Sequence, residues 1–188
     1  MEDEWIRSEC RYALIGTDML AAALPASERA ALDMDFTEAL VELFPDCTAV
    51  YFENSGKLFT AETIRNHTLP RDNRFIQFAV NVRFFTIQGG EDMLVDTLGM
   101  SLLFLPDIQY HFHGLDPNLM VNHAYNTALY LLINDNPIET GNTIDGIPDG
   151  SAQSERWICR YEESLIQPVR EVLDIDTGAY AAGNRQYE

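Results

Sequence analysis

The feature that most constrains the fold is an alternating segment that turns back on itself near the middle of the chain. Residues 75–88 give the longest strand signal in the chain, with one buried and one mixed face. Within it Phe78, Val80, Val82 and Phe84 alternate with Gln77, Ala79, Asn81 and Arg83. Gly89 and Gly90 interrupt the alternation, and residues 93–97 read as a second strand. Two strand-like segments around a glycine turn predict a β-hairpin, so the chain is expected to contain an antiparallel sheet.

Other short segments rich in β-branched and aromatic residues predict further strands. They cover residues 11–15, 48–52, 108–113, 157–161 and 169–175. The last two are expected to form a closing pair. Residues 134–153, which contain several prolines and glycines, are expected to form one long loop.

Two amphipathic helices are predicted between these strands. Asp116 followed by Pro117 is a strong helix start, and the helix is expected to run over about 117–133, with Tyr125 and Leu129 buried. Its full apolar stripe is Val121, Tyr125, Ala128, Leu129 and Leu132.

The other helix is expected over about 28–44, with Ser27 as its N-cap. Its predicted apolar stripe is Leu32, Phe36, Ala39, Leu40 and Leu43. Hairpins together with segregated helices define an α+β fold: a mainly antiparallel sheet with both helices packed on it. At 188 residues, we expect a single domain over 1–175 and a flexible C-terminal tail over 176–188.

Charge limits the classes of partner. Thirty Asp and Glu face twelve Lys and Arg, which gives a formal net charge of −18. Such a surface repels nucleic-acid phosphates and anionic lipids, so nucleic-acid and membrane roles are disfavoured. The acidity suits a basic protein partner, and it equally fits a protein that uses its charge for solubility alone. The acidic N-terminus lacks the basic residues of an export signal, so we expect a cytoplasmic location.

The sharpest candidate for chemistry is the pair His111 and His113, whose i, i+2 spacing on a strand points both imidazoles to one face. Two imidazoles can bind one divalent metal ion, with Asp107 and Asp116 at the strand's ends as further ligands. The same pattern also fits an amphipathic strand that binds no metal. No other cofactor is predicted.

Several short segments in the second half resemble the bacterial family called domain of unknown function 4261. They are 96–100 (DTLGM), 105–109 (LPDIQ), 115–117 (LDP), 141–144 (GNTI), 160–164 (RYEES) and 168–170 (PVR), within a resemblance over about 93–173. The family has no established activity or catalytic residues, so the resemblance implies kinship and no particular reaction.

The sequence lacks the nucleophile elbow, the phosphate-binding loop and the dinucleotide fingerprint. We therefore expect an uncharacterised, non-catalytic protein-binding module, of the immunity or toxin-associated type. Two alternatives remain: a metal-dependent enzyme such as a hydrolase centred on His111 and His113, and a small-molecule binder.

Overall fold

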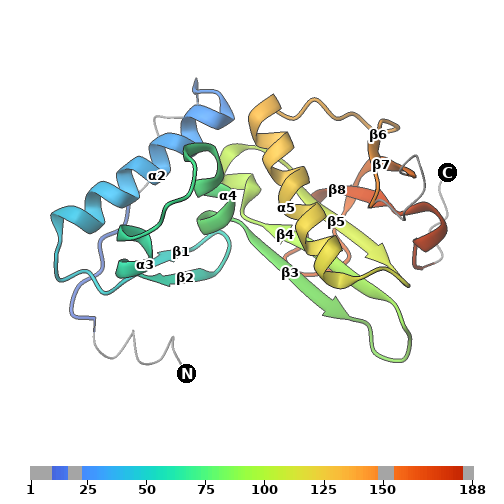
Figure 1. Ribbon diagram of the computed structural model, residues 1–188, viewed down its shortest axis with the longest axis horizontal. Helices are drawn as coiled ribbons and strands as arrows, with labels where there is room; N and C mark the ends of the chain where they lie inside the picture. The colour runs from blue at the N-terminus through green and yellow to red at the C-terminus, as the bar shows by residue number, and fades with distance from the viewer. Residues whose placement is uncertain (1–9, 17–22, 148–154, 184–188) are drawn as a thin grey trace. The chain divides into compact units, whose positions relative to one another are not determined.

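A computed structural model describes residues 10–16, 23–147 and 155–183 of the chain. These residues fall into two compact units, Met1–Asn81 and Val82–Glu188, called here the N-terminal and the C-terminal unit (Figure 1). The expectation of a single domain over 1–175 stays a prediction. Among the described helices, none combines the length and apolar character needed to cross a membrane.

The N-terminal unit combines helices with a small hairpin. Its described helices are α2 (Ala26–Leu43), α3 (Ala61–Arg65), η2 (Arg71–Asn73) and α4 (Arg74–Ala79). Strands β1 (Ala49–Phe52) and β2 (Lys57–Thr60) pair antiparallel. Helix α2 packs against α3, η2 and α4.

Helix α2 confirms the predicted helix over about 28–44, but the predicted buried side is wrong. Leu32 and Phe36 are each 49% exposed and Leu43 is 70% exposed. The buried residues are Ala26, Arg29, Ala30, Ala31, Met34 and Val41. Small alanines allow neighbouring elements to approach closely, and so they, rather than the largest apolar side chains, face the interior. Ser27 lies inside the helix, which begins after Pro25.

The predicted strand over residues 75–88 is only half correct. Its first part forms helix α4, and only β3 (Asn81–Thr86) is extended. Phe75, Phe78 and Ala79 are buried at helical spacing, while the sole lysine, Lys57, donates hydrogen bonds from Nζ to the carbonyl oxygens of Gln77 and, at 3.0 Å, Val80. A cation at the carboxyl end of a helix satisfies its last carbonyl groups.

The predicted strand over residues 11–15 is also wrong, because residues 12–16 have no regular structure. A Cβ atom added to Gly16 would lie 2.7 Å from Cε1 of Phe36, so this segment passes close to one side of α2.

The C-terminal unit is built on a six-stranded sheet in the order β3-β4-β5-β8-β7-β6 (Figure 1). The remaining strands are β4 (Met93–Leu98), β5 (Asp107–Phe112), β6 (Thr143–Asp145), β7 (Arg156–Glu163) and β8 (Glu171–Asp176). β5 and β8 run parallel, whereas β4–β5, β6–β7 and β7–β8 are antiparallel. The sheet is mostly antiparallel with a helix packed on it, which confirms the α+β fold and the closing pair β7–β8.

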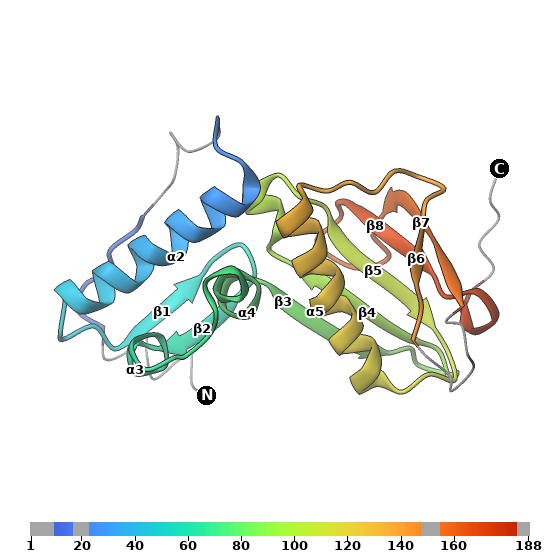
Figure 2. The same cartoon turned by 45° about the horizontal axis from the view of Figure 1, so that its top comes forward.

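Helix α5 (Pro117–Asn134) contacts β4 and β5 (Figure 2). Asp116 caps it as predicted, accepting a 2.8 Å hydrogen bond from the backbone N–H of Asn118. Its buried residues are Met120, Ala124, Thr127, Ala128, Leu131 and Leu132. Tyr125 and Leu129 are only half-buried, so the predicted stripe is rotated around the helix from the true one.

Two segments that were expected to be irregular contain short regular elements. β6 lies inside the expected loop over residues 134–153, of which 148–153 are outside the described residues. The start of the expected tail contains the turn η4 (Gly178–Tyr180) and the buried Ala182. Residues 184–188 of that tail are outside the described part.

Candidate functional site

The two faces of the six-stranded sheet differ in chemistry. Val95 lies opposite Tyr110, and Asp96 lies opposite Gln109. Because successive strand residues point to opposite faces, Val95 and Tyr110 share the face that contacts α5, and Asp96 and Gln109 share the other. Gln109 is also in register with Asp174 on β8, and its Nε2 donates to Oδ1 of Asp174 at 3.0 Å. Together with Asp107, these three side chains form what we call the buried polar layer, and all four are at most 2% exposed.

Two arginines hold Asp96 in this layer. Arg83 on β3 binds it with two hydrogen bonds, Nε to Oδ1 at 2.9 Å and Nη2 to Oδ2 at 2.5 Å. Arg170 donates from Nη2 to the same Oδ2 at 2.7 Å, and to the carbonyl oxygen of Thr97 at 2.6 Å. Such paired guanidinium–carboxylate contacts are among the strongest hydrogen bonds in proteins.

Asp107, the first residue of β5, receives a similar set of donors. Its Oδ2 accepts from Nε of Arg170 at 2.9 Å. Its Oδ1 accepts from the hydroxyl of Thr97 and from the backbone N–H of Met100, both at 3.1 Å. Burial raises the pKa of Asp107, and the positive charge of Arg170 opposes that rise.

The loop between β7 and β8, residues 164–170, is tied to the same layer. The backbone N–H of Leu165 donates to Oε1 of Gln109 at 2.7 Å. Nη1 of Arg83 donates to the carbonyl oxygen of Gln167 at 3.1 Å. The two arginines and Gln109 therefore fasten this loop to β3, β4 and β5.

The contacts within this network decide its chemical role. A general base or nucleophile needs a lone pair directed at a substrate. Each carboxylate oxygen of Asp96 and Asp107 already accepts at least one hydrogen bond from the protein. We conclude that the Arg83–Asp96–Arg170–Asp107 network holds the strands and the loop together.

On the opposite face, a second polar chain joins the sheet to α5. The hydroxyl of Tyr110 lies 2.8 Å from Nδ1 of His123 and 3.2 Å from Oγ1 of Thr127. Nε2 of His123 lies 2.8 Å from the carbonyl oxygen of Asp145 in β6. Because a carbonyl oxygen only accepts, Nε2 carries the proton and Nδ1 is left as an acceptor.

The surroundings of His123 favour its neutral form. Its ring centroid lies 5.5 Å from that of Tyr110 and 5.1 Å from that of the buried Trp157. Burial lowers the pKa of His123, partly offset by the hydrogen bond to Asp145, and burial raises the pKa of Tyr110. The pair is therefore a neutral hydrogen-bonded link between β5, α5 and β6.

The structure gives the four residues proposed as metal ligands separate roles. Asp107 is bound by Arg170, and Asp116 caps α5. His111 lies on the face of the buried polar layer, opposite Leu94, with its Nε2 3.9 Å from Oδ2 of Asp92. His113 follows the end of β5, where its backbone N–H donates to Tyr180.

Within the described ranges of the chain, no group of three or more His, Cys, Asp or Glu side chains is arranged to hold a metal ion. A metal site on His111 and His113 stays a prediction. A pocket of about 200 Å³ lies beside His111 on the face opposite α5, lined also by Asp174 and Gly183. Pockets for drug-sized ligands are usually larger, about 300–1,000 Å³.

Sequence reasoning missed the two arginines that organise this face, Arg83 and Arg170. One signal was present: arginine supplies all but one of the twelve basic residues, and arginine is the residue suited to buried pairing with carboxylates. Their partners could not be chosen without knowing that β5 lies between β4 and β8.

Fold and site together define an α+β protein whose sheet packs one face against helix α5 and carries buried, paired charges on the other, beside the loop over residues 164–170. Residues 96–176 match the family described as Domain of unknown function (DUF4261), which confirms the resemblance noted in the sequence. The match begins at Asp96 and includes Asp107, Gln109 and Arg170, whereas Arg83 precedes it. A search of curated proteins and a search of solved structures gave no match.

Proposed function

We propose that this chain is a non-catalytic protein-binding module whose partner is a basic protein, in the manner of immunity proteins that neutralise toxins. The observation that carries the proposal is the internal pairing of two buried carboxylates with two arginines. Asp96 and Asp107 are paired with Arg83 and Arg170 inside the sheet. Two of the few cations are thus used internally, and most of the unbalanced negative charge falls on the surface.

The acidic excess is strong in the C-terminal unit. Residues 82–188 contain sixteen Asp and Glu against five Arg and no Lys. One of those arginines, Arg156, already pairs with Asp145. A surface of this kind attracts a basic protein over a distance of about 10 Å at 0.1 M salt.

One pair of carboxylates on this surface is placed at a cost to the fold. Glu163 and Glu171 lie directly opposite each other at the ends of β7 and β8, and both are exposed. Like charges in directly opposite positions destabilise a sheet. A cationic side chain of a partner would remove this repulsion, so we assign the two residues to the binding surface.

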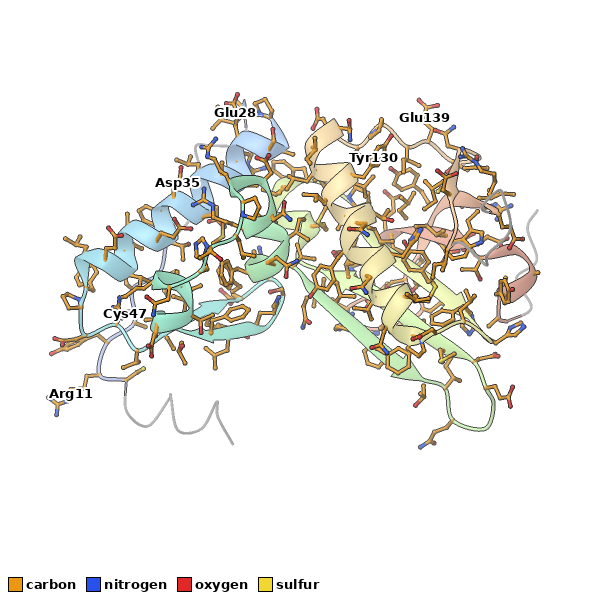
Figure 3. All side chains as sticks on the ribbon, in the orientation of Figure 1. Arg11, Glu28, Asp35, Cys47, Tyr130 and Glu139 are labelled. Atoms are coloured by element: carbon orange, nitrogen blue, oxygen red, sulfur yellow. The ribbon has the colours of Figure 1, made fainter. Side chains whose placement is uncertain are left out.

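The test is to capture partners with the full chain from its source organism, then measure the affinity of the purified partner for charge-reversed variants. Glu163→Arg with Glu171→Arg should weaken binding by at least about tenfold, equivalent to about 1.4 kcal/mol. The matched control, Glu91→Arg with Glu139→Arg, changes two exposed loop residues by the same total charge (Glu139 is labelled in Figure 3). An acidic partner, or equal weakening by both variants, would contradict the proposal.

A further inference from the structure

The strand β3 is an outer edge of the six-stranded sheet. Among the described strands it neighbours β4 alone. The backbone N–H of Ile87 donates to the carbonyl oxygen of Asp92 at 2.9 Å, and Arg83 pairs with Asp96. In an antiparallel pair, hydrogen-bonding groups point to the partner strand at every second residue. Ile87 and Arg83 are odd-numbered, so the backbone hydrogen-bonding groups of the odd-numbered residues of β3 point to β4.

It follows that the backbone groups of Val82, Phe84 and Thr86 point away from the sheet. Natural proteins usually protect such an edge with charged side chains, prolines or bulges. Here Arg83, the one charged residue of β3, is bound to Asp96, and no Asp or Glu occurs from residue 73 to residue 90. Phe84 and Phe85 are 41% and 39% exposed, on opposite faces of the strand.

We propose that β3 pairs antiparallel with β3 of a second copy of this chain, which continues the sheet from one copy into the other. A two-fold axis perpendicular to the sheet leaves each residue of both copies on the same face of the continued sheet. Residues that lie opposite each other share a face, so even-numbered residues of one copy must lie opposite even-numbered residues of the other. The register that meets this condition with Phe84 opposite Phe84 also places Val82 opposite Thr86. These are the residues whose backbone groups point outward.

Side chains favour the same register. It places Arg83 of one copy opposite Phe85 of the other, and Arg83 already lies over the ring of its own Phe85 at 5.6 Å. Stacking of a guanidinium on an aromatic ring is attractive. Shifting the register by two residues in one direction would put Arg83 opposite Arg83, which is repulsive.

Charge points to a second copy as the occupant. Two chains of net charge −18 repel each other over most of their surfaces, whereas the stretch from residue 73 to residue 90 carries no carboxylate. The pairing is therefore expected to strengthen as salt rises and screens the surrounding repulsion. A complex with a basic protein has the opposite salt dependence, so the dimer stands or fails independently of the proposed function.

The experiment is analytical ultracentrifugation of the full chain across a wide concentration range, in about 0.1 M and about 1 M sodium chloride. The expected mass rises with concentration from 21.3 kDa toward twice that value, and rises further in high salt. Phe84→Glu places two carboxylates opposite each other and should leave a monomer. The matched control Ile133→Glu, at a residue of α5 that is 54% exposed, should keep the dimer.

A second variant tests the backbone rather than the side chain. Thr86→Pro removes an outward N–H, which an edge strand tolerates within its own fold. It should abolish the dimer while circular dichroism and the melting temperature stay near those of the parent. A monomer at every concentration in both salts, or a dimer that survives both Phe84→Glu and Thr86→Pro, would overturn the proposal.

Discussion

Arg170 holds Asp107 with a 2.9 Å hydrogen bond from its Nε atom, although the two residues are 63 positions apart in the chain. The same guanidinium binds Asp96, so one side chain joins the start of β8 to both β4 and β5. The parallel neighbours β5 and β8 bring these groups together.

Arg170→Ala should therefore destabilise the fold strongly. The change leaves Asp107 without its cation in a buried position, which costs about 3–5 kcal/mol. The control is Arg156→Ala, which breaks a pair of two exposed side chains and should cost at most about 1 kcal/mol. Urea unfolding measures both, and equal losses would show that the buried network does not stabilise the sheet.

The rotation of α5 relative to its predicted stripe can be tested on one helix. Leu131 is fully buried, whereas Leu129 is half-buried. Leu131→Ala should cost about 2–5 kcal/mol through lost burial and the cavity left behind, and Leu129→Ala should cost distinctly less. A lower denaturation midpoint for Leu129→Ala than for Leu131→Ala would mean that α5 packs its other side against the sheet.

His123 should give the fold a dependence on pH. Because burial lowers its pKa, the folded chain binds fewer protons than the unfolded chain below about 6.5, the ordinary pKa of histidine. The contribution of neutral His123 to the unfolding free energy is complete above that pH. It is lost as the pH falls through the lowered pKa of His123 in the folded state. Its slope is at most about 1.4 kcal/mol per pH unit.

The measurement is the unfolding free energy between about pH 7 and pH 5, in the parent and in His123→Gln. The difference between the two chains isolates the histidine from the many carboxylates that titrate at lower pH. Parallel curves for the two chains would show that His123 does not titrate in the way its burial implies.

Metal addition tests the alternative built on the histidine pair. A metal that binds only the folded chain raises its melting temperature. We expect no rise with zinc, nickel or manganese, and no difference in response to metal between the parent and the His111→Gln, His113→Gln double variant. A rise in the parent that the double variant loses would establish the metal site and set the present account aside.

Much of the C-terminal unit could be predicted from the sequence, because its strands and α5 are marked by strong local signals. Asp116 and Pro117, for example, are the N-cap and the first residue of α5, a start signal that two neighbouring residues contain. Helix α4 could not be predicted, since Phe75, Phe78 and Ala79 fit a helix while the same stretch also alternates as a strand does.

The buried polar layer depends on information that no local pattern contains. Arg83 meets Asp96 across a hairpin, but Arg170 reaches the same carboxylate from 74 residues away. Only the order of the strands brings them together. The candidate ligands Asp107 and Asp116 were correctly located at the ends of their segments, yet the first proved to be an ion-pair partner and the second a helix cap.

The central claim, that the acidic surface takes a basic protein, is tested most directly by the salt dependence of the captured partner's affinity. Isothermal titration calorimetry should compare about 0.1 M with about 1 M sodium chloride, between which the electrostatic reach shortens from about 10 Å to about 3 Å. We expect a basic partner whose affinity falls steeply as the salt concentration rises. An acidic partner, or an affinity unchanged between the two salt levels, would contradict it.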